Sequence, residues 1–294
     1  PELERLQAIA SAMGKKASVA LRINPDVDAK THAKITTGTS ENKFGVPIDH
    51  AREIALKSKD WSHVAVEAIS MHIGSQILDL QPYEQAFERM AALAKDLIAQ
   101  GVELKRLDVG GGLGIAYSHD ATPPADQVEK YAAMIKKHFA GFKLPMVLEP
   151  GRYMVGNAGL LLTEVVYVKQ AVSKRFLILD SAMNDLIRPA MYEATHQVLG
   201  LKQSQEPHMA QDLVGPVCES GDTFAKNFAM PPVSQGEVIA FQSAGAYSAV
   251  MASTYNARVL VPEVLVKGSD FAVIRKRQTL DELIALDQTP AWLN

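Results

Sequence analysis

The stretch RLDVGGG, residues 106–112, decides the fold class of this chain, because a short apolar run leads directly into three consecutive glycines. Three further apolar runs also end in polar or glycine residues, and they are VALRIN (19–24), AISMHIGS (68–75) and PMVLEPG (145–151). Between these runs, residues 83–99 and 127–139 carry apolar side chains close to the 3.6-residue period of an α-helix. The alternation predicts the βα units of a parallel sheet, with polar strand ends facing one site.

The number of βα units falls short of a complete barrel. A (β/α)8 barrel has eight strands and typically about 250 residues, whereas residues 1–157 supply four such units. The opening PELERL (1–6) has the pattern of an amphipathic helix and not that of a disordered terminus. We therefore expect residues 1–157 to form the C-terminal half of a barrel whose first half precedes Pro1.

Residues 158–294 show a different pattern, which is typical of β-strands. The stretches 160–169, 174–180, 237–241 and 257–266 are apolar and are separated by turn residues. Helical spacing is scarce here, except for a short terminal helix expected at 280–286. The prediction is a mainly antiparallel β domain, so the whole chain is assigned to an α/β plus β class.

Composition and charge exclude several classes of protein. A chain that is 47% hydrophobic and 21% charged is not mainly disordered, and a net charge of −3 argues against a nucleic-acid binder. No apolar stretch reaches the ~18 residues of a membrane-spanning helix. The single cysteine, Cys218, excludes an intrachain disulfide and suits the cytoplasm. No metal site is expected, because the histidines lack the spacing of metal ligands.

Residues that can bind an anion stand at two of the strand ends. The backbone N–H groups of Gly110, Gly111 and Gly112 can approach a phosphate closely, although the same glycines would also suit a tight turn. Glu149 can hold a protonated ring nitrogen, and Arg152 can bind phosphate or carboxylate through two hydrogen bonds. A surface ion pair between these two side chains is the alternative.

Two other positions carry side chains that suit a functional site. His72 and Ser75 end the second apolar run, where a hydroxyl and an imidazole can face a ligand, although a lone histidine can also be structural. In the β domain, Cys218 and Glu219 are followed by Asp222, and a thiol beside carboxylates can move protons. A small buried thiol is the alternative.

The order and spacing of these motifs resemble the fold-type III pyridoxal-phosphate decarboxylases. The resemblance covers nearly the whole chain, and its further matching stretches are RINPDV (22–27), SENKFG (40–45), RPAMY (188–192) with Ala194 and His196, CES (218–220) and AGAY (244–247). It implies an alanine-racemase-like (β/α)8 barrel followed by a β domain. It also implies a homodimer with shared active sites, because in this family Cys218 and Glu219 would come from the partner subunit.

The resemblance also implies the cofactor, pyridoxal 5'-phosphate, and a role for each matching residue. The cofactor would be held by His72, Ser75, Gly110, Gly111, Gly112, Glu149, Gly151, Arg152 and Tyr247. His72 would stack on its ring and Glu149 would pair with the pyridinium nitrogen, and both are catalytic together with Cys218. The amino-acid substrate would be held by Arg152, Arg188, Tyr192, Glu219 and Tyr247.

Within this family, the element RPAMYEATH (188–196) marks the branch that converts meso-2,6-diaminopimelate into L-lysine and CO₂. A decarboxylase of another basic amino acid or polyamine precursor, and a non-catalytic homologue that binds a related enzyme, remain alternatives. The family forms its Schiff base through a lysine in a Tyr-Ala-x-Lys-Ala segment, which this sequence lacks. The resemblance therefore implies that the 294 residues alone are inactive.

Overall fold

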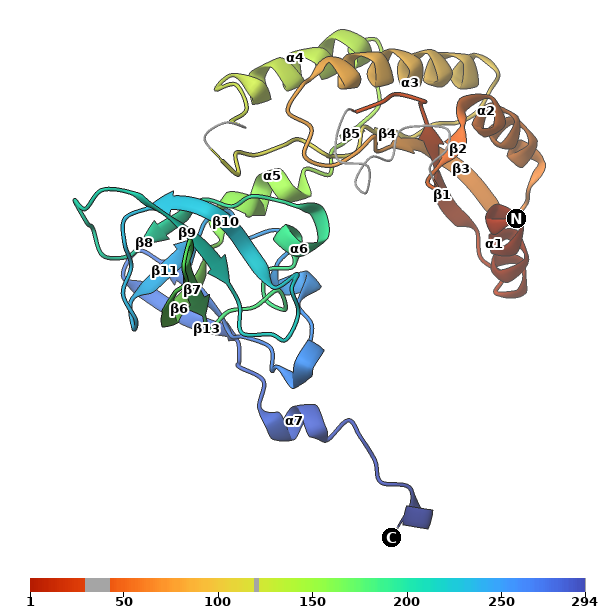
Figure 1. Ribbon diagram of the computed structural model, residues 1–294. Coiled ribbons are helices and arrows are strands. Elements are labelled where there is room, and N and C mark those ends of the chain that lie inside the picture. The colour runs from red at the N-terminus through yellow and green to blue at the C-terminus, as the bar shows by residue number, and fades with distance from the viewer. Residues whose placement is uncertain (30–42, 119–121, 294) are drawn as a thin grey trace. The chain divides into compact units, whose positions relative to one another are not determined.

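The computed structural model describes residues 1–29, 43–118 and 122–293, and the chain divides into two compact units (Figure 1). The first unit is Pro1–Met154 and the second is Val155–Asn294. The motif at 40–45 lies partly outside the described residues, which resume at Lys43. In the described part of the chain, no helix combines the length and apolar character needed to cross a bilayer.

The first unit is built on a sheet of five parallel strands in the order β2-β1-β3-β4-β5. The strands are β1 (Ala17–Asn24), β2 (Val46–Pro47), β3 (Val64–Met71), β4 (Arg106–Asp108) and β5 (Met146–Val147). The helices are α1 (Glu2–Ala12), α2 (Ile48–Lys57), α3 (Gln81–Ala99), α4 (Gln127–Phe139) and α5 (Gly151–Val155), which runs into the second unit. The predicted βα alternation is confirmed, and β2 is an additional short strand at the edge.

Helices α3 and α4 lie side by side over the sheet of the first unit (Figure 1). An aromatic cluster joins them, with ring centroids 5.0 Å apart for Tyr83 and Tyr131 and 5.6 Å apart for Phe87 and Phe139. All four rings are buried, and they continue into the core formed by the strand residues. The packed layer of α3 and α4 therefore supports the sheet, whose parallel strands all have their carboxyl ends at the same edge.

The second unit contains a six-stranded sheet in the order β10-β9-β7-β6-β11-β8 and a separate hairpin of β12 and β13. Its strands are β6 (Leu161–Gln170), β7 (Arg175–Leu179), β8 (Val198–Gly200), β9 (Met209–Val214), β10 (Thr223–Met230), β11 (Val238–Phe241), β12 (Glu263–Lys267) and β13 (Asp270–Arg275). Its helices are α6 (Arg188–Tyr192) and α7 (Leu280–Ile284). The sheet is antiparallel except where β7 pairs with β9, so the expected β domain is confirmed.

The strand expected over residues 257–266 is wrong in its first half. Asn256 and Ala257 have φ values of 58° and 54°, which belong to the left-handed region and not to a strand. Pro262 has no N–H group to donate to a neighbouring strand, and β12 begins directly after it at Glu263. The terminal helix begins at Leu280 because Thr279 and Glu282 form a capping box.

Candidate functional site

The glycine loop at the end of β4 packs backbone against backbone on the neighbouring strand ends. A Cβ atom on Gly110 would lie 2.0 Å from the carbonyl oxygen of Met71, and one on Gly111 would lie 1.9 Å from that of Glu149. Gly112 has a φ of 102°, and a Cβ there would lie 2.2 Å from the carbonyl oxygen of Gly74. These contacts bring the ends of β3, β4 and β5 together, as the parallel sheet predicts. The three glycines are therefore needed for this close approach of the backbone.

The N–H groups of this loop are partly used within the protein. Gly110 donates to a carboxylate oxygen of Asp108 at 2.9 Å, and Gly111 donates to Nδ1 of His72 at 3.3 Å. The buried hydroxyl of Tyr83 donates to the carbonyl of Gly111 at 3.0 Å. Contact between the glycine amides and a phosphate therefore remains a prediction, while their role in fixing His72 is visible.

His72 follows β3 directly and is half-buried. Because its Nδ1 accepts the hydrogen bond from Gly111, the proton of the neutral ring is placed on Nε2. Burial lowers the pKa of His72, and the nearby charge of Arg22 lowers it further. The ring is thus neutral at physiological pH, which suits an imidazole that stacks on an aromatic ligand.

Arg152 is buried, with 7% of its surface exposed, so the alternative of a surface ion pair is wrong for it. Its Nη2 donates to the hydroxyl of Ser75 at 3.0 Å, and its Nη1 donates to the hydroxyl of Tyr117. Both acceptors are neutral, so they orient the guanidinium without taking up its charge. A fixed positive charge beside a serine hydroxyl is suited to binding an anion.

Tyr117 was missed by the sequence reasoning, although it lies shortly after the glycine loop in a stretch rich in glycine and polar residues.

Glu149 is exposed, and its backbone N–H donates to the carbonyl of Gly110 at 2.7 Å. The pKa of Arg22 is lowered, because burial lowers it more than the nearby charge of the Glu149 carboxylate raises it. Gly151 is exposed, and a Cβ there would meet nothing within 4 Å, so packing gives no reason for a glycine.

In the second unit, Arg188 begins α6 and is buried, with 6% of its surface exposed. Its Nη1 lies 2.8 Å from Nε2 of His196, and Nδ1 of His196 lies 2.8 Å from the carbonyl oxygen of Gln242. Tyr192 ends the same helix and is half-buried. The predicted substrate residues Arg188 and Tyr192 therefore share one helical turn.

Cys218 and Glu219 lie in an exposed turn between β9 and β10, so the alternative of a buried thiol is wrong. Asp222 is buried, and its carboxylate accepts hydrogen bonds from the backbone N–H groups of Val217 at 2.8 Å and Met183 at 2.7 Å. Burial raises the pKa of Asp222, while these two hydrogen bonds oppose the shift. Asp222 therefore has a structural role: it ties the cysteine turn to the segment before Arg188.

Tyr247 lies in the loop after β11, is exposed and has a φ of 58°. A tyrosine in the left-handed region is strained, and such strain is common at functional sites. The structure thus groups the predicted residues within each unit. His72, Ser75, the glycine loop, Glu149 and Arg152 gather in the first unit, and Asp222 links the Cys218 turn to the Arg188 segment in the second.

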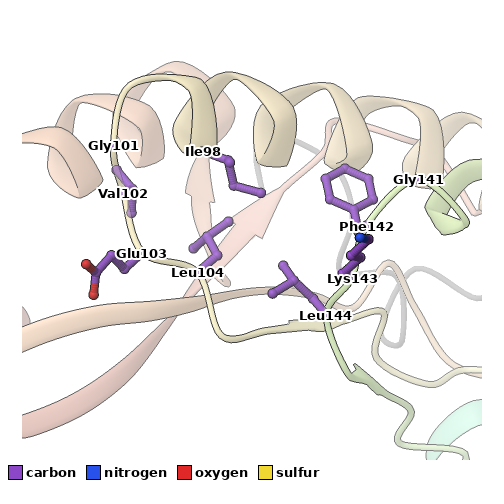
Figure 2. A pocket seen from close by; sticks show the side chains of 9 residues that line it. All are labelled: Ile98, Gly101, Val102, Glu103, Leu104, Gly141, Phe142, Lys143 and Leu144. Carbon is purple, nitrogen blue, oxygen red and sulfur yellow. The ribbon is translucent and has the colours of Figure 1, made fainter.

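The first unit also contains a hollow of about 600 Å³, which lies away from the glycine loop (Figure 2). It is formed by the loops that lead from α3 into β4 and from α4 into β5, so it opens at the strand ends opposite to the glycine loop. Its lining is Ile98, Gly101, Val102, Glu103, Leu104, Gly141, Phe142, Lys143 and Leu144. Among the described residues, no group of three or more histidine, cysteine, aspartate and glutamate side chains could hold a metal ion.

Comparison with family models gives two matches. Residues 1–156 match the pyridoxal-binding domain of pyridoxal-dependent decarboxylases, and residues 91–245 match the C-terminal sheet domain of the same enzymes. Diaminopimelate decarboxylase from Zymomonas mobilis is 45% identical over 292 residues, which are 99% of this chain and 69% of that protein. The enzyme of the same name from Pseudomonas aeruginosa is also 45% identical, over 97% of this chain and 68% of that protein.

Solved structures give the same result. Diaminopimelate decarboxylase from Helicobacter pylori complexed with L-lysine has a TM-score of 0.92 and 42% identity, over 97% of this chain and 70% of that one. Diaminopimelate decarboxylase from M. jannaschii, in co-complex with L-lysine, has a TM-score of 0.91 and 35% identity, over 100% of this chain and 68% of that one.

Proposed function

Because the chain belongs to the pyridoxal-dependent decarboxylase family, we propose that it converts meso-2,6-diaminopimelate into L-lysine and CO₂ with pyridoxal 5'-phosphate as cofactor. The observation that carries this proposal is the 45% identity to diaminopimelate decarboxylases over nearly the whole chain. The buried Arg188 supports it, because only a substrate with a second carboxylate calls for a guanidinium at that end.

The residues of the first unit fit the cofactor. Arg152 and Ser75 offer a guanidinium and a hydroxyl to its phosphate, and the neutral ring of His72 can stack on the pyridine. Glu149 would hold the proton on the pyridine nitrogen. The chemistry supplied by bound pyridoxal phosphate would be that of an electron sink for the loss of CO₂. Gly151 and Tyr247 would also contact the phosphate in this proposal.

The residues of the second unit would hold and protonate the substrate. Arg188 and Tyr192 would bind the distal carboxylate, and Glu219 would bind the ammonium group beside it. The exposed thiol of Cys218 would deliver a proton to the carbon that lost CO₂. We also propose a cytoplasmic homodimer in which the partner subunit supplies Cys218 and Glu219 to each site.

Two alternatives are weaker. A lysine decarboxylase and an arginine decarboxylase share the fold at 24% and 22% identity, so their substrates carry no argument here. A non-catalytic homologue would have no chemical need for His72, Glu149, Cys218 and Tyr247 together.

The test is growth of a lysine-requiring bacterium that lacks diaminopimelate decarboxylase, supplied with the complete natural reading frame of this protein. Growth without lysine is expected. The purified protein should also release CO₂ from meso-2,6-diaminopimelate and not from L-lysine, L-ornithine or L-arginine. Turnover of one of the latter three instead would select the first alternative, and no turnover of any would select the second.

A further inference from the structure

The geometry points to His196 as a positioning residue that aims Arg188 at the substrate carboxylate without neutralising it, an inference that rests on the proposed function. Arg188 can only donate hydrogen bonds, and the carbonyl of Gln242 can only accept them. With both contacts at 2.8 Å, Nε2 of His196 must be the acceptor and Nδ1 must carry the proton. The two partners therefore fix one neutral tautomer of the ring.

The ring itself is fixed by the sheet. His196 is buried, with 5% of its surface exposed, and stands just before β8. The residue after it, Gln197, accepts a backbone hydrogen bond of 2.8 Å from Gln242, and the pairing continues between Val198 and Phe241. The position of the imidazole is therefore set by the ladder of β8 and β11, and through it the guanidinium of Arg188 is set as well.

The choice of an imidazole has a chemical consequence. A carboxylate at this place would form an ion pair with Arg188 and would compete with the carboxylate of an incoming amino acid. A neutral nitrogen gives the same orientation and takes up none of the charge. His196 does not need to touch the substrate, and its effect is confined to ligands that carry a carboxylate for Arg188.

The test compares two ligands that differ in that group: L-lysine, which keeps the carboxylate, and 1,5-diaminopentane, which lacks it. Calorimetry is done on the protein expressed from its complete reading frame with pyridoxal phosphate. In His196→Asn, the side-chain amide can still donate to Gln242 but cannot reach Arg188. This variant should bind L-lysine about tenfold more weakly, with 1,5-diaminopentane nearly unaffected. His196→Gln places an amide oxygen near the position of Nε2 and should restore much of the L-lysine affinity.

Arg188→Gln separates the two levels of the argument. If it weakens L-lysine binding while His196→Asn and His196→Gln both bind like the unmodified protein, the positioning role is overturned and the proposed function stands. If Arg188→Gln also leaves L-lysine binding unchanged, both the positioning role of His196 and the proposed function are overturned. Nitrogen-15 spectra of the imidazole give a readout that needs no ligand and no variant: a neutral ring with its proton on Nδ1 supports the inference, and a proton on Nε2 overturns it.

Discussion

The hydroxyl of Tyr83 on α3 donates a hydrogen bond of 3.0 Å to the carbonyl of Gly111 in the glycine loop. Gly111 in turn donates to Nδ1 of His72, so one peptide unit on each side of this glycine is held by a side chain. Since Tyr83 is buried in the aromatic cluster, the helix layer supports the glycine loop directly.

Replacement of Tyr83 by phenylalanine should therefore loosen the glycine loop. The buried carbonyl of Gly111 loses a donor, and we expect about 1–3 kcal/mol less free energy of unfolding together with weaker binding of pyridoxal phosphate. Urea unfolding and cofactor titration measure the two effects. Tyr131→Phe, which removes a hydroxyl from the same cluster, is the matched control and should leave cofactor affinity unchanged. Equal losses in both variants would contradict the prediction.

The glycine loop should not accept even a methyl group. In Gly111→Ala, the new Cβ would meet the carbonyl oxygen of Glu149 at 1.9 Å, so the backbone must move and the strand ends must separate. A loss of several kcal/mol of unfolding free energy is expected, since steric conflict in a packed backbone is a severe class of mutation. Gly151→Ala, where a Cβ meets nothing within 4 Å, is the control for the fold. Its thermal midpoint should match that of the unmodified protein.

Glu84 on α3 makes the first unit sensitive to acid. Its carboxylate accepts from Nζ of Lys137 and from Nε2 of His138 on α4, and these hydrogen bonds lower the pKa of Glu84 below its usual 4.5. A depressed pKa in the folded state means that the stabilisation is present above pH ~4.5 and is lost as the pH falls through the lower folded value. Glu84→Gln should flatten the pH dependence of stability in that acid range. An unchanged slope would show that the contact contributes nothing.

A site shared between two subunits can be tested by mixing. Cys218→Ala and Glu149→Gln, each made in the complete reading frame, should both have little activity as pure dimers. After subunit exchange, hybrid dimers would contain one site with both residues intact, and part of the activity should return. Activity that stays absent although exchange is demonstrated by mass spectrometry would exclude the shared site.

Some elements of the fold could be predicted from the sequence because their hydrophobic patterns are long and regular. Residues 127–139 were expected as a helix and form α4. The elements that were not expected include the short β2, with two residues, and α6, with five, and also α2, with ten, and β10, with eight. The strand ends were placed correctly because parallel strands with polar carboxyl ends leave few arrangements open.

The supporting residues of the site could not be predicted, because their partners lie far away in the sequence. His196 is positioned by Gln242, which is 46 residues distant, and Tyr83 looks like any other apolar member of its helix. The structural role of Asp222 was not expected, because burial cannot be seen in a sequence. The roles of the cofactor and substrate residues, and the inactivity expected for the 294 residues alone, remain predictions.

The two hydrogen bonds of Asp222 also have a kinetic consequence. They join Met183, which lies 39 residues before Asp222, to Val217, which lies 5 residues before it, through a single carboxylate. The cysteine turn and the segment that leads to Arg188 should therefore open as one cooperative unit, and the amide hydrogens of Met183 and Val217 should exchange with solvent at a common opening free energy. A substrate that stiffens the Arg188 segment would then also slow exchange in the cysteine turn, which is proposed to serve the partner's site, so that the two sites to which one chain contributes become ordered together.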